Sequence, residues 1–228
     1  IISTHSLIEV KMNPALIELI ILAGIAVFLF LRLRSVLGTR EGFEKPRMQP
    51  KNDAPKRDFK VIDGGEDKDI TDNVEKNSKS AKALKTIKEK DETFTVNEFL
   101  SGARSAYEWI LMSFEKNEID DIRELLSEEV AEAFDSVVEQ RISQGLTIEA
   151  EFIGVREMKL VDASYNSKTK TAEIAVSFIG EMTSVVKNSS GEIVEGDSKQ
   201  IKRQKDTWTF SKDTQSSDPN WLLVETGE

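Results

Sequence analysis

The stretch Phe99-Leu-Ser-Gly-Ala-Arg-Ser-Ala-Tyr-Glu-Trp-Ile-Leu-Met-Ser-Phe114 decides the fold, because its apolar side chains recur at steps of three and four residues. That spacing places them on one side of an α-helix and predicts an amphipathic helix with a broad apolar face. Thr95 or Asn97 is suited to cap the start of this helix, since each side chain carries an oxygen that accepts a backbone N–H. The apolar positions are Phe99, Ala103, Ala106, Tyr107, Ile110, Leu111 and Phe114.

Two further helical patterns follow before any strand pattern begins. The first is short and covers residues 119–126, and the second starts at Ser127, a residue type favoured at helix N-caps. Three consecutive helices are therefore expected to precede the strands. Their apolar positions are Ile119, Ile122, Leu125, Leu126, Val130, Ala133, Phe134, Val137 and Val138.

After Gly145 the period of the pattern changes to two, which is typical of half-buried strands. The first strand runs through Ile148 to Leu160, and Gly154 interrupts its alternation, which indicates a bulge in a long bent strand. The second strand carries Ala172, Ile174, Val176 and Phe178 on one face. Later strands are predicted within Ile201–Phe210 and Trp221–Val224, after turn residues at Asn188–Gly191 and Asp218–Asn220.

Helices followed by antiparallel strands indicate an α+β fold. We therefore expect residues 94–228 to form one domain, in which N-terminal helices pack on a curved antiparallel sheet that curls over the first helix. This domain holds 14 basic and 26 acidic side chains, a net charge of −12. An acidic domain has no long-range attraction for phosphates, so no nucleic acid partner is expected.

Upstream of the domain, residues 14–33 are predicted to form a transmembrane helix. Residues 14–31 hold one ionisable side chain, Glu18, and as a helix they would reach roughly 27 Å, close to the thickness of a hydrocarbon core. Residues 32–60 that follow carry a net charge of +5, and Arg32, Arg34 and Arg40 lie nearest to the helix. Basic flanks remain in the cytoplasm, so we expect a single-pass protein of the inner membrane with its C-terminal domain in the cytoplasm.

The remaining N-terminal segments are expected to have no fold of their own. Residues 1–13 form a short tail, and the residues before Met12 are expected to be an artefact of translation or processing. Residues 34–93 are predicted to form a charged, disordered linker, since they are too polar to offset the entropy of ordering. A weak apolar stripe of Ala81, Leu84 and Ile87 within 78–90 fits either a transient solvated helix or a partner-binding helix.

Enzymatic chemistry finds little support in the sequence. Cysteine is absent and His5 is the single histidine, so the domain lacks a Ser-His or Cys-His nucleophile, and no phosphate loop or metal-ligand spacing occurs. We therefore predict a non-enzymatic protein with no catalytic, cofactor-binding or metal-binding residues. The alternative is an isomerase-like pairing of a carboxylate with a tyrosine, using Asp206 with Tyr107 or Tyr165.

Aromatic side chains from the first helix and from the strands form the candidate binding site. They are interpreted either as the lining of an apolar pocket or as ordinary core, and an open pocket would suit an acyl chain or an apolar peptide segment. Trp221 belongs to the same aromatic set. The pocket candidates are Tyr107, Phe152, Phe178, Trp208 and Phe210.

Four motifs in order and spacing resemble the Tim44-like domain of the mitochondrial import motor anchor. They are Phe99-Leu-Ser-Gly-Ala-Arg104, Glu195-Gly-Asp197, Asp206-Thr-Trp-Thr-Phe210 and Asp218-Pro-Asn-Trp221. With the N-terminal segment ending in Leu31-Arg-Leu-Arg-Ser-Val-Leu-Gly38, the chain resembles the bacterial branch of that family, the TimA-type adaptors of alphaproteobacteria. The resemblance implies a cone-shaped fold similar to nuclear transport factor two, with an apolar pocket.

The resemblance also implies a membrane-anchored adaptor. Its partners would be membrane lipid, through the N-terminal helix, and proteins, namely membrane proteins and the translocation or quality-control machinery. The alternative function is a membrane tether that associates with lipid or with ribosomes, although the acidic domain argues against ribosomes. The mitochondrial relatives recruit a chaperone through a segment whose place is taken here by the polar linker.

Overall fold

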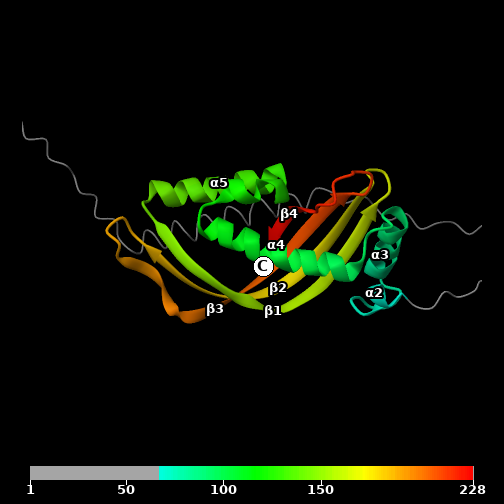
Figure 1. Ribbon diagram of the computed structural model, residues 1–228, viewed down its shortest axis with the longest axis horizontal. Helices are drawn as coiled ribbons and strands as arrows, with labels where there is room; N and C mark the ends of the chain where they lie inside the picture. The colour runs from blue at the N-terminus through cyan, green and yellow to red at the C-terminus, as the bar shows by residue number, and fades with distance from the viewer. Residues whose placement is uncertain (1–66, 228) are drawn as a thin grey trace, which may run out of the picture. The chain divides into compact units, whose positions relative to one another are not determined.

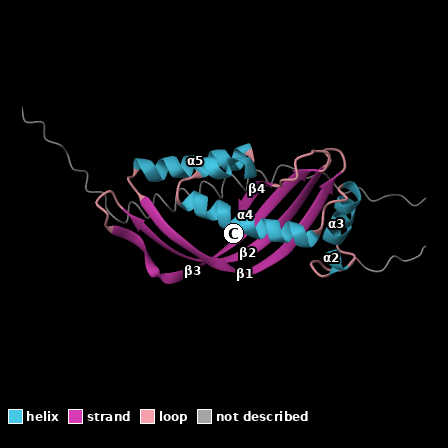
Figure 2. Cartoon of the chain, viewed as in Figure 1, coloured by secondary structure: helices cyan, strands magenta, loops and turns pink. Residues whose placement is uncertain are grey.

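The computed structural model describes residues 67–227, which form helices followed by a four-stranded sheet (Figures 1 and 2). The predicted tail, the predicted transmembrane helix and the flanking Arg32, Arg34 and Arg40 lie outside these residues. Within residues 67–227 no helix is both long and apolar enough to span a membrane. The elements are α2 (Lys68–Thr71), α3 (Lys79–Lys90), α4 (Val96–Glu115), the 3-10 helix η1 (Ile119–Leu125), α5 (Glu128–Ser143), β1 (Thr147–Asn166), β2 (Thr171–Lys187), β3 (Ile193–Asp213) and β4 (Leu222–Gly227).

The four strands follow one another in space as in sequence, and every neighbouring pair is antiparallel. The predicted alternation of β2 is confirmed, because Ala172, Ile174, Val176 and Phe178 are all fully buried. The predicted bulge is confirmed too, since the register of β1 against β2 shifts between Phe152 and Gly154. Two more shifts in β1 increase its bend, and the sheet is strongly curved (Figure 1).

Helix α4 lies along the concave side of this sheet (Figure 2). The Thr95 side chain accepts the backbone N–H of Glu98 and so caps the helix, as predicted. The apolar face predicted from the sequence is the face that meets the sheet, with Phe99, Ala103 and Tyr107 among its buried members. The predicted α+β architecture with a sheet curled over the first helix is therefore confirmed, and it is consistent with a cone-shaped domain similar to nuclear transport factor two.

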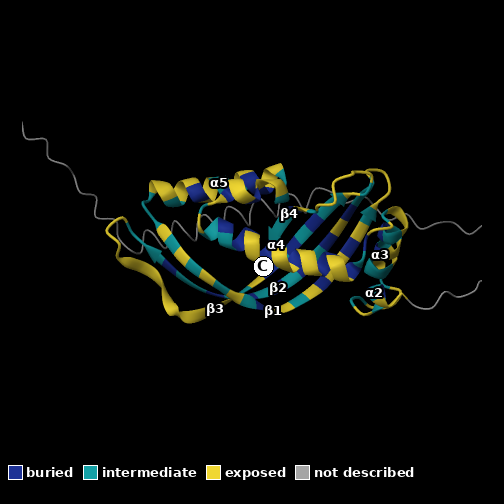
Figure 3. Cartoon of the chain, viewed as in Figure 1, coloured by how far each residue is buried: buried dark blue, intermediate teal, exposed yellow. Residues whose placement is uncertain are grey.

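Residues 67–93 correct one prediction, because they are folded rather than part of a disordered linker. Helix α3 occupies nearly the predicted range, capped by Ser78, but it packs against β1 with Leu84 and Ile87 buried (Figure 3). Ile70 of α2 is buried as well. A helix of this length with so few apolar residues would be marginally stable by itself in water. Burial of its apolar residues against the sheet stabilises it in the folded domain.

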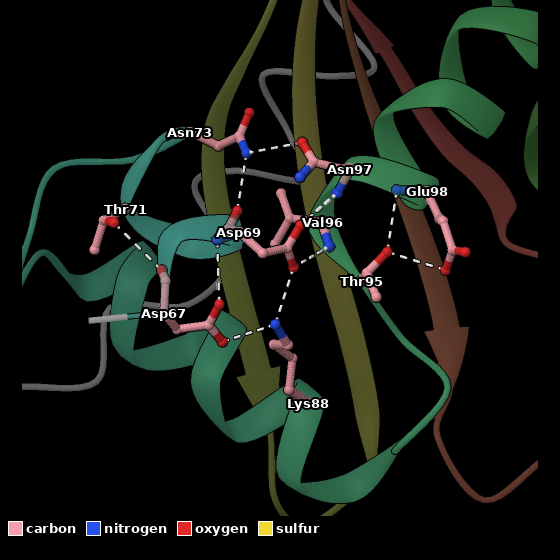
Figure 4. A network of polar contacts seen from close by, with 9 residues as sticks. All are labelled: Asp67, Asp69, Thr71, Asn73, Lys88, Thr95, Val96, Asn97 and Glu98. Carbon is pink, nitrogen blue, oxygen red and sulfur yellow. Dashed lines mark hydrogen bonds and ion pairs between the residues drawn. The ribbon is translucent and has the colours of Figure 1, made fainter. Parts of the chain in front are cut away.

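A polar network fastens α2 and α3 to the start of α4 (Figure 4). The Asp69 carboxylate accepts the backbone N–H groups of Val96 and Asn97, at 2.8 and 3.0 Å, and thereby caps a helix that begins 27 residues later. Lys88 of α3 donates to Asp69 and to Asp67 at 3.0 and 2.7 Å. Because N–H groups in the first turn of a helix lack intrahelical partners, Asp69 satisfies donors that would otherwise be unpaired.

Substituting Asp69 by Ala should destabilise the domain by about 1–2 kcal/mol in urea unfolding, since it removes these caps. Burial by itself would raise the pKa of Asp69, but hydrogen bonds from Val96, Lys88 and Asn97 outweigh it and hold the pKa below its ordinary value of 3.8. The stabilisation is thus fully present above pH 3.8 and is lost as the pH falls below that value. Asp72→Ala, at an exposed position beside α2, is the control and should change stability little.

Candidate functional site

A buried hydrogen bond joins α4 to β3 at the centre of the domain. The Tyr107 hydroxyl donates to Asp206 Oδ2 at 2.5 Å, and the Gln204 side chain donates to Asp206 Oδ1 at 3.0 Å. Burial raises the pKa of Tyr107 far above its usual range, and the neighbouring Asp206 carboxylate raises it further. The phenol therefore stays protonated and acts as a permanent donor to the carboxylate.

The ring of Tyr107 fits closely against the sheet. It stacks on Phe178 with ring centroids 4.4 Å apart and planes 8° from parallel, and it lies 4.7 Å from the ring of Trp208. A Cβ at Gly180 would lie 2.6 Å from the Tyr107 hydroxyl oxygen, so this position in β2 has no room for a larger residue. Glycine here permits the close approach of helix and sheet.

The predicted pocket residues are brought together, but their rings pack against one another. Phe152 lies 6.2 Å from Tyr107, and Trp208 lies 6.0 Å from Phe178 and 6.3 Å from Phe210, all between ring centroids. These are ordinary distances for packed aromatic pairs, which favours the interpretation of this cluster as core. Of the five candidates, Phe210 alone lines the open cleft described next.

An open cleft of about 360 Å³ lies at the N-terminal half of α4, beside β3 and the segment that enters β4. Its aromatic wall is continuous, because the ring of Phe99 lies 4.8 Å from Trp221, 5.9 Å from Phe210 and 6.2 Å from Phe94. Helix α4, which carries Phe99, also contributes small residues to the lining, and these leave space beside the aromatic rings. The apolar and small lining residues are Phe94, Phe99, Gly102, Ala103, Ala106, Leu125, Phe210 and Trp221.

Charged and polar groups surround this apolar cleft. Asp91 and Lys212 form an ion pair at 2.8 Å, and both side chains are largely buried. Burial opposes ionisation of Asp91, but Lys212 and Thr93 hydrogen-bond to its carboxylate and keep its pKa below the usual range. Because the pair is matched and bonded, it shapes the cleft and does not supply a free acid or base.

The lining of this cleft combines aromatic and small residues with a few polar and charged ones. The set of lining side chains includes neither Tyr107 nor Asp206, whose hydrogen bond lies in the core. Across residues 67–227 there is no group of three or more His, Cys, Asp or Glu side chains placed to hold a metal ion. An apolar floor with a polar rim is the usual form of a recognition site.

Several lining residues were missed by the sequence analysis. Asp91 falls within the predicted linker, Phe94 is the first residue of the predicted domain but was assigned no role, and Gly102 falls in the predicted helix without any signal that it faces a cleft. Asn220 belongs to a quoted motif, Asp218-Pro-Asn-Trp221, but was interpreted as a turn residue, whereas Trp221 was already counted in the aromatic set that fits either a pocket or the core. The motif was the available signal, because a turn that contains Pro and Asn next to a partly buried aromatic residue is suited to the rim of a site.

The described residues form an α+β domain with an open apolar cleft, and comparison with known proteins places it in a family. The Tim44-like domain pattern matches residues 80–228, and the chain belongs to the Tim44-like domain family, as the sequence motifs indicated. Among solved structures, the intermembrane space region of the chloroplast protein ARC6 is similar, with a TM-score of 0.35 and 9% identity over 63% of this chain and 94% of that one. No curated protein matches the chain.

Removing the Tyr107 hydroxyl tests the buried hydrogen bond. Tyr107→Phe should lower the free energy of unfolding by about 1–3 kcal/mol, because it takes a donor from a buried carboxylate. Tyr165→Phe is the matched control: its hydroxyl is partly buried and lies 3.4 Å from the Thr214 hydroxyl, a long contact that should contribute much less. Equal losses in urea unfolding would contradict a special role for the Tyr107–Asp206 bond.

Proposed function

We propose that this protein is a membrane-anchored adaptor whose Tim44-like domain binds apolar segments of other polypeptides in the aromatic cleft. The observation that carries the proposal is the open apolar cleft bordered by Phe94, Phe99, Phe210 and Trp221. Its volume lies within the range of sites that hold small ligands and is enough for a few apolar side chains. The clients would be proteins in translocation, membrane-protein assembly or quality control.

A polypeptide segment suits both parts of the cleft. Its apolar side chains would pack on the aromatic wall, while its backbone amides would meet polar groups at the rim such as Thr93 and Asn220. Charge adds a preference, since Glu98 lies in the lining and Asp218 in the adjoining hollow. A client with basic residues beside its apolar segment therefore fits this rim best, as expected for a domain with a net charge of −12.

The membrane anchor is part of the same proposal and rests on sequence alone. Residues 14–31 have the length and apolarity of a spanning helix, and the +5 flank that follows favours a cytoplasmic C-terminal domain. Confinement to a membrane surface would raise the local concentration of the domain near membrane-bound clients. Because Tyr107 and Asp206 are committed to each other in the core, binding rather than catalysis is the proposed activity.

Filling the cleft should abolish client binding without weakening the fold. Gly102 lies in α4 and faces the cleft, and a Cβ added there meets nothing within 4 Å. Gly102→Leu would place a side chain in the cleft and remove a helix-interior glycine, which should stabilise α4 by about 0.5–1 kcal/mol. Chemical crosslinking in intact membranes followed by mass spectrometry should recover protein partners with the wild type and lose them with this variant.

Ser105→Leu is the matched control, because Ser105 is an exposed residue of α4 outside the cleft lining. This variant should retain the partners of the wild type. Equal recovery with Gly102→Leu and Ser105→Leu would rule out the cleft as the client site. Recovery of lipid alone, with no reproducible protein, would favour the lipid-tether alternative over the adaptor.

Orientation can be tested through the basic flank. Reversing Arg32 and Arg34 to Glu lowers the net charge of residues 32–60 from +5 to +1. The domain should then become accessible to protease added outside spheroplasts, whereas the wild-type domain should stay protected. Continued protection in the double variant would show that these two arginines do not set the orientation.

A further inference from the structure

More than half of β3 forms an edge of the sheet. Strand β4 pairs only with Thr207–Ser211 of β3, so residues 193–206 have β2 on one side and no strand on the other among residues 67–227. The exposed stretch spans residues 193–203 without interruption (Figure 3). Unpaired N–H and C=O groups along such an edge are available to another strand.

The side chains of this edge are unusual for a solvated strand. Three apolar side chains are well exposed: Ile193 at 58%, Val194 at 43% and Ile201 at 54%. Burying them would be favourable, because it removes apolar surface from water. Natural sheets commonly protect an edge by shortening it or by covering it. This edge is long, and three of its apolar side chains lack cover within the described part of the chain.

Charges along the edge are divided by sign. The acidic side chains Glu195 and Asp197 come first, and the basic side chains that follow are Lys199, Lys202, Arg203 and Lys205, of which Arg203 also contacts Glu181 of β2 at 2.9 Å. The register against β2 passes from Asp197 directly to Lys202, so residues 198–201 bulge out of the ladder between the two halves. The charges of this edge are therefore complementary to those of a second copy of the same edge that runs antiparallel to it.

We propose that the exposed edge of β3 pairs antiparallel with the same edge of a second copy of this chain. With the twofold axis at Gln200, Glu195 and Asp197 of one copy lie opposite Lys205 and Arg203 of the other. The symmetry repeats both contacts, giving four pairs of opposite charge across the interface. The two bulges then meet at the axis, which brings Ile201 of one copy near Ile201 of the other.

The charge pattern favours a second copy over an unrelated partner. A uniformly acidic or basic peptide would meet like charges over half of this edge, which is unfavourable for directly opposed residues. A second copy meets only opposite charges in the register centred on Gln200. The domain carries −12 overall, so two copies repel at long range and the association depends on these local pairs.

Two charge-reversal variants test the pairing. E195K/D197K makes all four paired positions basic and R203E/K205E makes all four acidic, so each variant should self-associate at least about tenfold more weakly than the wild type by sedimentation equilibrium. An equal mixture of the two variants restores all four opposite-charge pairs. In the heterodimer each substituted residue faces a substituted residue of opposite sign, and each unchanged residue faces an unchanged residue of opposite sign. Heterodimers should therefore form with about the wild-type affinity.

Full-length protein is used throughout, and K116E/K168E is the control that makes the same change in net charge as R203E/K205E at exposed sites outside β3. This control should dimerise like the wild type. A wild-type protein that stays monomeric, a dimer unaffected by either reversal, or a mixture that fails to rescue would overturn the proposal. Amide hydrogen exchange adds a local readout: protection of residues 193–205 should rise with protein concentration in the wild type and stay constant in each variant alone.

Discussion

The contact of Tyr107 with the sheet is the constraint on which the rest of the domain depends. Its ring stacks on Phe178, its hydroxyl is bonded to Asp206, and Gly180 leaves the space that the hydroxyl needs. Apolar packing alone would let α4 slide along the curved sheet. A directional hydrogen bond in an apolar core defines one position, because any other position would leave a buried polar group without its partner.

Because Tyr107 fixes the middle of α4, it also fixes where the N-terminal half of this helix lies. The N-terminal half carries Gly102, Ala103 and Ala106 toward β3 and β4, and these small residues leave a cleft that larger ones would fill. Asp69 and Lys88 hold the start of this helix from a segment outside the sheet. The polar network therefore stabilises one end of the cleft, and the aromatic residues Phe99 and Trp221 form its wall.

The local patterns of the sequence predicted the elements of the fold well. The alternation of Ile174, Val176 and Phe178 identified a buried strand face, and Gly154 identified a bulge, because both signals arise from residues adjacent in sequence. The family motifs indicated the domain for the same reason. Helix α3 was found as a pattern, but its packing was not, since a Lys-rich helix with two buried residues resembles a solvated one until its partner surface is known.

The candidate site was less predictable because it depends on distant contacts. Tyr107 and Asp206 were considered as a possible pair, yet no spacing shows that residues 99 positions apart meet in the core. Nor does any sequence pattern show that the predicted pocket aromatics fill their own space while Phe94, Gly102 and Trp221 border an open cleft. Side-chain volume and the placement of α4 decide between core and pocket, and both are properties of the folded chain.

If client polypeptides bind in the cleft, a photo-crosslinking residue at its rim should capture them. Asn220 is exposed at the cleft and Glu151 is exposed on β1, outside the cleft lining. With the crosslinker at position 220, irradiation of intact membranes should yield adducts with apolar polypeptide segments, and position 151 should yield none of them. Adducts with lipid alone at position 220, or the same protein adducts from both positions, would contradict client binding in the cleft.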